Sequence, residues 1–310
     1  MRLAVLADVH GNLPALQAVL ADMRRQRVDG IIVAGDLVGG PQPVEVLGLL
    51  RSLNNCWMIR GNSDNYFLDH DAGNGPDGWR TSKQWAPMRS SYRYLDREAL
   101  DFVASLPEQR VIALDGVAPI RVVHGSPWGA AEGLFPDRDP VMLRVFRDAC
   151  LLAPDCEPVG LDSVLARIDE RVLVCGHTHI PWKQEQDGGL VFNPGAVCGP
   201  LNGDARAQYA LLAWQDGRWR VEHRAVVYDL ERIRAAFDES GWLAEGGALS
   251  RAFLFSIETG RNVGVYFLNY AYGLAAEAGF EGCDVVPDAV WERAEDTFDW
   301  DGAVGNRELV

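Results

Sequence analysis

The sequence predicts an α/β fold in which parallel strand–helix–strand units come first and a β-rich half follows. Over residues 2–59, three short apolar runs alternate with two segments of helical periodicity, an order typical of right-handed parallel crossovers. Between residues 110 and 227, six further apolar runs are separated by turn residues, which predicts additional strands. A change of composition beyond residue 228 predicts a C-terminal appendage of helices and loops.

The first half contains five predicted elements. Arg2–Ala7 is a continuous apolar run, as expected of a buried strand. Leu13–Met23 has apolar residues three and four apart, which predicts one buried face of a helix. Gly30–Ala34 is a second strand, Val44–Leu53 a second helix, and Cys56–Ile59 a third strand.

Residues 65–95 lack clean periodicity although they contain Trp79, Trp85, Tyr92 and Tyr94. We expect a long surface loop of the kind that often has a function, with irregular packing as the alternative. Gln215-Asp216-Gly217 predicts a hairpin turn between the last two strands. The strands expected after the loop are 110–114, 120–124, 172–175, 190–192, 209–214 and 219–227.

The acidic charge is concentrated at the C-terminus. The chain has 44 Asp plus Glu against 29 Lys plus Arg, a formal charge of −15, which argues against nucleic-acid polymers and anionic membranes as partners. Residues 229–310 contain 16 acidic residues and 6 Arg. Helices are expected over 263–278 and 288–298, and a loop over Gly241–Gly247. We expect 229–310 to cap a main domain formed by 1–228, or else to form a homodimer contact.

The cysteine pattern and the apolar segments bear on where the protein is found. Six Cys are scattered without a C-x-x-C pair, so we expect reduced, mostly buried thiols. The apolar N-terminal stretch is too short for a signal peptide. The longest uncharged apolar segment, Asn262–Ala276, has 15 residues and is shorter than a membrane span. We therefore expect a cytoplasmic protein with no membrane association.

Five short polar motifs follow apolar runs, and four of the six histidines fall within them. Loops after strand ends are the usual ligand-binding positions of open sheets. Asp8 and His10 are two residues apart, so an extended backbone directs both side chains the same way, and His177 and His179 repeat this spacing. The motifs are Asp8-Val9-His10, Gly35-Asp36, Gly61-Asn62, His124-Gly125 and Gly176-His177-Thr178-His179.

Together with Phe192-Asn193-Pro194-Gly195, these motifs resemble the calcineurin-like metallophosphoesterase superfamily over residues 1–227, especially its small bacterial and archaeal phosphodiesterases. The resemblance implies a four-layered αββα sandwich of two mixed β-sheets with a binuclear metal centre. It implies that the first metal is held by Asp8, His10, Asp36 and His179. It implies that the second is held by Asp36 as a bridge, Asn62, His124 and His177. Catalytic roles are expected for Asp36, Asn62, His124 and His177.

The donor types agree with this chemistry. Imidazole and carboxylate ligands suit Mn, Fe, Zn, Co or Ni, of which we expect Mn. Two divalent ions can clamp the oxygens of an in-line displacement and supply a bridging hydroxide near neutral pH. We therefore expect a hydrolase of phosphate esters, foremost a phosphodiesterase on a small or nucleotide-like substrate. The alternatives are a phosphomonoesterase, a dinucleoside-polyphosphate hydrolase, or a non-catalytic scaffold with the same fold.

The sequence departs from the family after the motif asparagine. Many members carry His there, whereas this chain has Ser63 followed by Asp64. Serine is a poor general acid near pH 7, so we expect either substrates with good leaving groups or an acid supplied by the 65–95 segment. His70 is the candidate, with a solvated loop residue as the alternative. Asp64, whose role in related proteins is to orient the missing His, is expected to hydrogen-bond a metal ligand.

Three more residues are candidates for substrate contacts. Arg60 is expected to grip a phosphate oxygen, or else to form a surface ion pair. Asn12 braces the first loop, or simply caps a helix. Ordinary packing is expected for Trp79, Trp85 and Trp128, with stacking on a nucleobase as the alternative. Of the three, Trp128, which follows His124 closely, is expected to lie nearest the metals.

Overall fold

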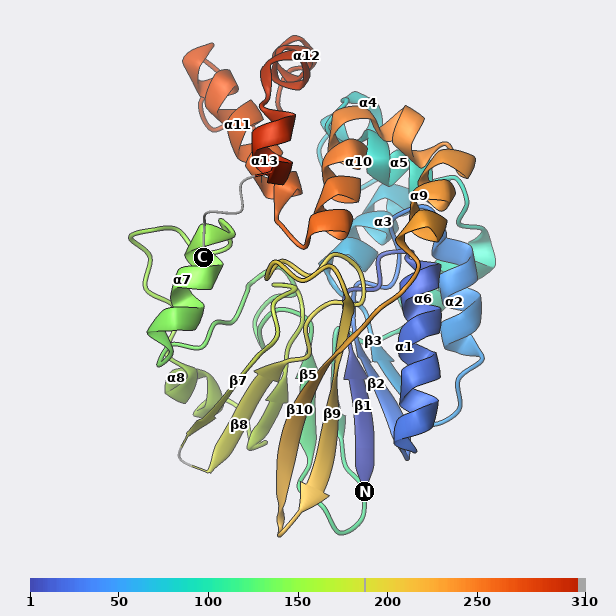
Figure 1. Cartoon of the computed structure of the whole chain (residues 1–310), viewed down its shortest axis with the longest axis vertical. Coiled ribbons are helices and arrows are strands. Elements are labelled where there is room, and N and C mark those ends of the chain that lie inside the picture. Colours follow the sequence, from blue (N-terminus) through green and yellow to red (C-terminus); the bar gives the residue numbers. More distant parts are fainter. Residues whose placement is uncertain (187, 306–310) are drawn as a thin grey trace.

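The computed structural model describes residues 1–186 and 188–305, and within them two five-stranded sheets lie between layers of helices (Figure 1). The strand orders are β10-β9-β1-β2-β3 and β4-β5-β6-β8-β7. Three hydrophobic clusters separate the layers. One lies between the sheets, and the other two lie between each sheet and its outer helices. The predicted α/β sandwich of two mixed sheets is therefore confirmed.

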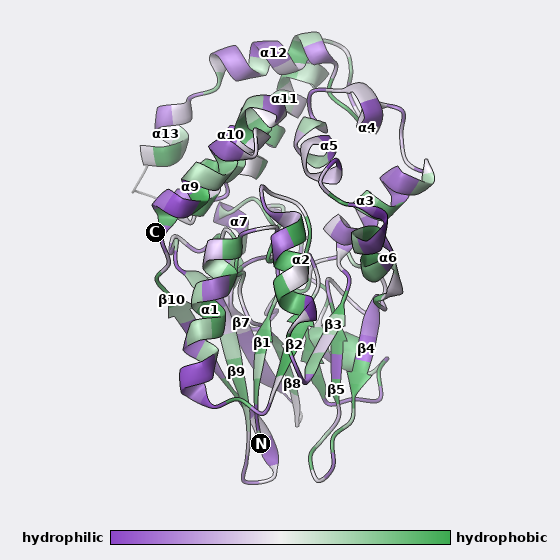
Figure 2. Cartoon of the chain, turned by 90° about the vertical axis from the view of Figure 1, so that its right-hand side faces the viewer, coloured by the Kyte–Doolittle hydropathy of each residue, from purple (hydrophilic) through white to green (hydrophobic). Residues whose placement is uncertain are grey.

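The first sheet comes from both ends of the main part of the chain. Its strands β1, β2 and β3 are parallel, whereas β9 is antiparallel to β1 and forms the predicted hairpin with β10. In Figure 2 the strands β1, β2 and β9 are mostly green, because their apolar side chains are buried on both faces. The strands are β1 (Arg2–Leu6), β2 (Gly30–Ala34), β3 (Cys56–Ile59), β9 (Ala207–Gln215) and β10 (Arg218–Val226).

The second sheet includes one strand that the sequence did not indicate. In β7 the ends Trp182 and Gln186 are buried and Lys183 and Glu185 are exposed, so its polar composition hides a strand at the sheet edge. The other strands of this sheet agree with the predicted runs. They are β4 (Gln109–Ile112), β5 (Ile120–Val123), β6 (Val172–Val174), β7 (Trp182–Gln186) and β8 (Gly189–Asn193).

Helices cover the outer faces of the two sheets. On the first sheet, α1 buries Leu16, Val19 and Met23 in one stripe, as its periodicity predicted. On the second sheet, Phe146 of α7 and Leu161 of α8 are fully buried. The helices in these layers are α1 (Leu13–Gln26), α2 (Pro43–Arg51), α6 (Arg97–Ser105), α7 (Pro140–Asp148) and α8 (Leu161–Leu165).

The prediction of a long loop over 65–95 is wrong. This segment forms most of α3 (Asn62–Ala72), then α4 (Gly78–Thr81) and α5 (Ala86–Tyr92). Its aromatic side chains form a cluster, with ring centroids of Tyr66, Trp79 and Trp85 between 4.5 and 5.6 Å apart. The helices are short and pack through this cluster rather than along one stripe, so no period is visible in the sequence.

The C-terminal extension consists of helices that stand over the ends of β1, β2 and β3 (Figure 1). The predicted helices over 263–278 and 288–298 are present. The predicted loop Gly241–Gly247 is wrong, because a helix begins at Trp242 and only kinks at Gly247, where φ is 58°. The helices are α9 (Leu230–Glu239), α10 (Trp242–Thr259), α11 (Val263–Glu277), α12 (Asp288–Thr297) and α13 (Trp300–Gly305).

Two separate cores hold the extension. Phe237, Trp242 and Ile257 of α9 and α10 belong to the same buried cluster as α1 and α2. Phe267 and Trp291 belong to a second cluster, formed by α10 to α13 alone. The inner half of the extension is thus continuous with the main core. None of the described helices is both long and apolar enough to cross a membrane, and all six cysteines are free.

Candidate metal centre

The five polar motifs meet at the carboxyl ends of parallel strands from both sheets. Asp8 and His10 follow β1, Asp36 follows β2, and Asn62 begins α3 after β3. From the second sheet, His124 follows β5, and the loop after β6 carries His177 and His179. Residues up to 171 positions apart in the chain, Asp8 and His179, thereby become neighbours.

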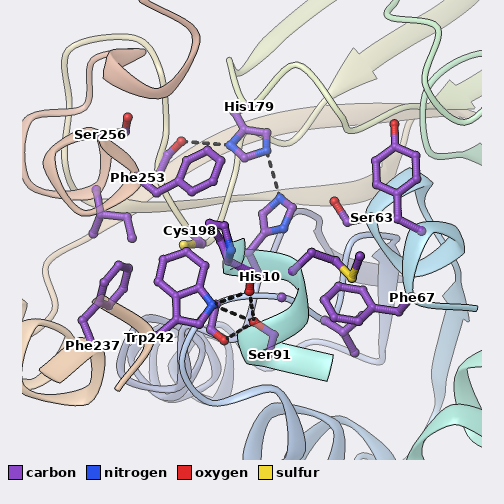
Figure 3. Close-up of a pocket in the computed structure, with 18 of the residues that line it drawn as sticks. His10, Ser63, Phe67, Ser91, His179, Cys198, Phe237, Trp242, Phe253 and Ser256 are labelled. Carbon is purple, nitrogen blue, oxygen red and sulfur yellow. Dashed lines mark hydrogen bonds between the residues drawn. The ribbon is translucent and has the colours of Figure 1, made fainter. Parts of the chain in front are cut away.

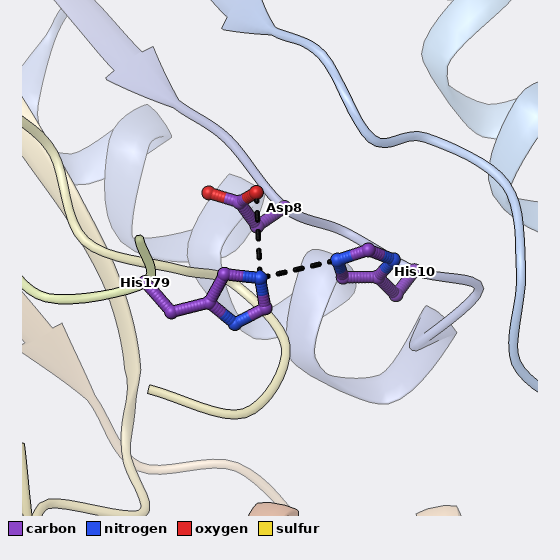
Figure 4. Close-up of side chains that lie close together, drawn as sticks. All are labelled: Asp8, His10 and His179. Atoms are coloured by element: carbon purple, nitrogen blue, oxygen red, sulfur yellow. Dashed lines mark hydrogen bonds and ion pairs between the residues drawn. The ribbon is translucent and has the colours of Figure 1, made fainter. Parts of the chain in front are cut away.

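One group of donors consists of Asp8, His10 and His179 (Figure 4). The Nε2 atom of His179 lies 3.2 Å from Nε2 of His10 and 3.4 Å from Oδ1 of Asp8. On its other side, Nδ1 of His179 donates to the carbonyl of Gly199 at 2.9 Å. This bond places the proton on Nδ1 and leaves the Nε2 lone pair directed at the group.

A second group consists of Asp8, Asp36 and His124. Here Nδ1 of His124 donates to the Ala34 carbonyl at 2.7 Å, so its Nε2 faces the group. The Asn62 side chain extends the group, because its Oδ1 lies 3.1 Å from Nε2 of His124 and 2.8 Å from Nδ1 of His177. All seven predicted ligands therefore lie in one continuous cluster.

Asp8 belongs to both groups, and Asp36 also connects them. Its Oδ2 lies 3.5 Å from Nε2 of His10 and 3.2 Å from Nε2 of His124. Ser63 holds the carboxylate in place, with its backbone N–H 2.9 Å from Oδ1 and its hydroxyl 2.9 Å from Oδ2. A carboxylate in this position can serve as the shared ligand of two cations.

The donor set fits divalent metal ions. Oδ2 of Asp8 is buried and has no hydrogen-bond partner, a state that costs free energy unless a cation satisfies the oxygen. The facing Nε2 atoms of His10 and His179 point lone pairs into the same space. Carboxylate, amide and imidazole donors together suit first-row transition metals.

The pKa values of the carboxylates reflect burial and mutual charge. Burial, together with the nearby Asp36, raises the pKa of Asp8 to about 7. Burial alone would also raise the pKa of Asp36, but the surrounding imidazoles, His124 foremost, outweigh it and hold that pKa well below its usual range. The two adjacent carboxylates therefore have opposite shifts, because burial dominates at Asp8 and the imidazoles dominate at Asp36.

The pKa values of the imidazoles also shift in opposite directions. Burial lowers the pKa of His10 and of His179, and burial with the neighbouring His124 lowers that of His177 to about 4. These three rings are therefore neutral near pH 7, as metal ligands must be. Asp36 outweighs burial at His124 and raises its pKa to about 10.

Backbone strain is concentrated at the same residues. Of the nine non-glycine residues with positive φ in the described part of the chain, five are predicted ligands: Asp8, His10, Asp36, His177 and His179. Such conformations cost about 1 kcal/mol or more each and persist where the surroundings enforce them. Gly61 permits the close packing, because a Cβ there would lie 2.1 Å from Oδ1 of Asp36.

Two buried polar side chains hold the ligand loops. Asp64 accepts from the backbone N–H groups of Leu37, Val38 and Gly61 at 2.8 to 3.0 Å, so it braces the loops that carry Asp36 and Asn62 rather than bonding a ligand side chain. Asn193 donates to the Gly176 carbonyl at 2.6 Å and to Thr178 Oγ1 at 3.1 Å. Asn193 lies in the Phe-Asn-Pro-Gly motif. The motif was visible in the sequence, but only the structure shows that Asn193 braces the loop of residues 176–178.

The structure places Arg60 away from the centre. Its guanidinium donates to the Leu106 carbonyl at 2.7 Å, to Asn65 at 2.8 Å and to Glu108 at 3.0 Å. These bonds, with a further one to Ala104, use four of its five N–H donors. Arg60 does not line the cavity beside His10, and the alternative of an ion pair agrees with its bond to Glu108.

Three other candidates also have structural partners. Asn12 caps α1 by accepting from the Ala15 N–H at 3.1 Å, which agrees with the capping alternative. His70 is on α3, with its ring edge-to-face on Tyr92 at 4.6 Å. Trp128 is 43% exposed and lies under the guanidinium of Arg167. None of the three lies among the donors that form the two groups.

Comparisons with known proteins identify the family of this chain. A family model described as the calcineurin-like phosphoesterase superfamily domain matches residues 1–217. A metallophosphoesterase structure from Sphaerobacter thermophilus is 27% identical with a TM-score of 0.61, covering 84% of this chain and 100% of its own. A hypothetical protein from Pyrococcus horikoshii OT3 has a similar fold, with 20% identity and a TM-score of 0.63 over 84% of this chain and 98% of its own.

The chain is also similar in sequence to a curated protein. This chain is 27% identical over 255 residues to an uncharacterised protein of Methanocaldococcus jannaschii, a match that covers 74% of this chain and 89% of the relative. The family match spans more than half of the chain and includes the loops that carry all seven donors. The chain therefore belongs to the calcineurin-like phosphoesterase superfamily, a family of metal-dependent phosphoesterases.

Proposed function

We propose that this chain is a phosphodiesterase that uses two divalent metal ions, foremost Mn²⁺, to hydrolyse small phosphate esters. The observation that carries the proposal is the position of Asp36, whose Oδ2 faces both His10 and His124. Asp8, His10, Asp36 and His179 would hold one ion. Asp36, Asn62, His124 and His177 would hold the other.

When bound, the two ions supply positive charge for the phosphate and lower the pKa of water between them. The protein's own contribution is position. Asp36 sets the separation of the two sites, and its orientation is held by Ser63. Backbone carbonyls at Ala34 and Gly199 fix the rings of His124 and His179, so the donors need little rearrangement during the reaction.

The charge around the open side of the site favours a diester. The side chains of His10 and His179 are 23% and 18% exposed, whereas those of Asp8 and His124 are fully buried, so substrate approaches past the first two. No Lys or Arg lines the cavity that opens there, among the described residues. A phosphate monoester carries two negative charges and would need a further cation, which these walls do not provide. A diester carries one negative charge and does not need it.

The residues present also favour good leaving groups. The Ser63 hydroxyl donates to Asp36, so its proton points at a carboxylate and not at a departing oxygen. His70 packs on Tyr92 and does not line the cavity that opens beside His10. With no imidazole in the position of a general acid, the leaving group must depart largely unprotonated.

Metal analysis combined with a substrate panel tests the proposal. Purified protein should contain close to two equivalents of transition metal and hydrolyse bis(4-nitrophenyl) phosphate faster than 4-nitrophenyl phosphate. The panel also includes cyclic nucleotides and dinucleoside polyphosphates. Asp36→Asn should lose metal and lower kcat/KM on the order of 1000-fold, while the exposed Asp296→Asn serves as a matched control.

Each contrary outcome points to a different alternative. Faster hydrolysis of the monoester would make the chain a phosphomonoesterase. Protein that binds no metal, and is inert with added Mn²⁺ on every ester, would indicate a non-catalytic scaffold. Full activity of Asp36→Asn would refute the assignment of the centre.

A further inference from the structure

A cavity of about 240 Å³ opens directly beside the metal centre, with His10 and His179 in its lining. Its walls come from two parts of the chain, because α3 and α5 of the main part face α9 and α10 of the C-terminal extension. In Figure 3, Phe253 and Trp242 lie on one side of His10 and Phe67 on the other. We call this space the apolar cavity.

The walls of the apolar cavity are uncharged. No Lys, Arg, Asp or Glu is among the described residues that line it. The side chains of Phe67, Phe237 and Trp242 are 5% exposed or less, so these walls are part of the packed core and not a mobile surface. A charged group placed here would be desolvated without a partner, which is strongly unfavourable.

Several polar groups of the lining are bonded to the protein, whereas Trp85 Nε1 is buried without a hydrogen-bond partner. Trp242 Nε1 donates to the Pro87 carbonyl at 2.9 Å and to Ser91 Oγ at 2.8 Å, and Ser91 in turn donates to the Gly40 carbonyl at 2.7 Å. Ser256 Oγ donates to the Ala252 carbonyl at 2.9 Å and accepts from the Gly264 N–H at 3.1 Å. The walls therefore offer a ligand apolar contact and few free hydrogen bonds.

We propose that the apolar cavity binds an uncharged, apolar substituent of the phosphate ester, such as a benzyl group or an alkyl chain, while the phosphate lies at the metal centre. This inference rests on the proposed function and narrows it. An apolar cavity of about 150 Å³ is enough to hold benzene, so the space here is large enough for a benzyl group or a short alkyl chain. A nucleoside fits poorly, because its sugar hydroxyls and base edges would lose water without finding partners.

The proposal gives the extension a definite part in substrate choice. Phe253 is 38% exposed, contacts the position where Gly264 lacks a side chain, and stacks on Trp242 at 6.1 Å. It therefore lies at the rim of the apolar cavity, where a substitution changes the wall without removing a fully buried side chain. Phe280 is 47% exposed in the same extension, is not in the lining, and provides a matched control.

The test uses 4-nitrophenyl phosphodiesters that share one leaving group and differ in the second substituent: methyl, butyl, benzyl, 4-carboxybutyl and thymidin-5′-yl. Burial of each methylene is worth about fourfold in kcat/KM, or roughly 50-fold from methyl to butyl at full burial. We expect butyl and benzyl to exceed methyl by tenfold or more. The carboxylated and nucleoside esters should fall well below butyl.

Variants assign the preference to the cavity. Phe253→Asp should bring the butyl-to-methyl ratio close to one. Phe280→Asp should keep the wild-type ratio. A loss of preference in both variants, or in neither, would overturn the assignment.

A binding measurement separates this inference from the proposed function. Butylphosphonate and methylphosphonate cannot be hydrolysed, and their binding can be followed by tryptophan fluorescence because Trp85 and Trp242 line the cavity. Tighter binding of butylphosphonate supports the inference even if no ester is hydrolysed, an outcome that would refute the proposed function alone. Equal binding and equal rates across the series, or preference for the thymidine ester, would overturn the inference.

Discussion

The metal centre and the apolar cavity both include His10 and His179 but are built on opposite principles. In the centre, donor atoms converge and one of them, Oδ2 of Asp8, is left without a partner. In the cavity, the polar groups of Trp242, Ser91 and Ser256 are bonded to the protein itself. Converging donors without partners suit metal ions and a phosphate, whereas a wall whose polar groups are mostly bonded to the protein suits the apolar substituent that we propose.

Metal removal should abolish most of the activity and leave the apolar cavity intact. Of the changes considered, it should lower kcat/KM the most. Chelation is expected to lower kcat/KM on the order of 1000-fold, because the proposed ions supply the positive charge and the activated water of the reaction. Stability should fall by about 3 kcal/mol relative to protein with metal at 100 times its Kd. Activity assays and thermal unfolding before and after re-addition of Mn²⁺ measure both effects.

Circular dichroism is the control for metal removal, because the described core contacts do not depend on metal and the helical signal should persist. A chelated protein that keeps its full rate would contradict a metal-dependent mechanism.

Removing residues 229–310 should eliminate one wall of the apolar cavity and leave all seven donors of the centre in the chain. The truncation takes away Phe237, Trp242 and Ile257, which are buried with α1 and α2, so apolar surface becomes exposed. We expect aggregation and binding of a hydrophobic dye, and the loss of any preference for butyl over methyl esters. Sedimentation, dye fluorescence and the ester series measure these effects.

A milder variant covers the case in which the truncated chain does not fold. Trp242→Phe keeps an aromatic wall but removes the donor to Pro87 and Ser91, at a cost of about 1–2 kcal/mol in stability. A truncated protein that stays soluble, fully active and selective would show that the extension is not a cap.

Asp22 is the centre of a charge network outside both regions. Substituting it should lower stability and have the smallest effect on activity. Asp22 on α1 accepts from Tyr209 at 2.6 Å, Arg224 at 2.8 Å and Arg25 at 2.9 Å. These bonds, that of Arg224 foremost, lower the pKa of Asp22 from 3.8 to about 2. The contribution of about 2 kcal/mol is complete above pH 4 and is lost as the pH falls through about 2.

Asp22→Asn should therefore lower the free energy of unfolding by about 2 kcal/mol at pH 7 and flatten its acid dependence, with kcat/KM unchanged. Urea titrations between pH 2 and 7 measure this. Asp101→Asn, in an exposed pair with Arg97, should cost less than about 1 kcal/mol. If Asp22→Asn changed the ester preference, the two regions would not be independent of the rest of the fold.

The candidate centre was largely predictable, because its residues follow strands at fixed short spacings. Asp8 and His10 could be recognised because they follow a strand end, but both have positive φ, so the extended backbone expected between them is wrong. Arg60 could not be placed in the same way: it follows a strand too, but its long side chain reaches carbonyls of residues 104 and 106. A flexible side chain takes its partners from whatever packs beside it.

The sequence by itself indicated nine of the ten strands in the described residues and the motifs that carry the donors, because both depend on periodicity and spacing within short segments. The assignment of those donors to two metals came from the resemblance to the family. The tertiary structure alone decided the apolar cavity, the helices of residues 65–95 and the bracing role of Asn193. Phe67 lies far from Trp242 and Phe253 in the chain and shares no motif with them, and the three side chains face one space only because α3 and α10 pack together. Contacts between distant apolar segments are not specific enough to be seen in the sequence.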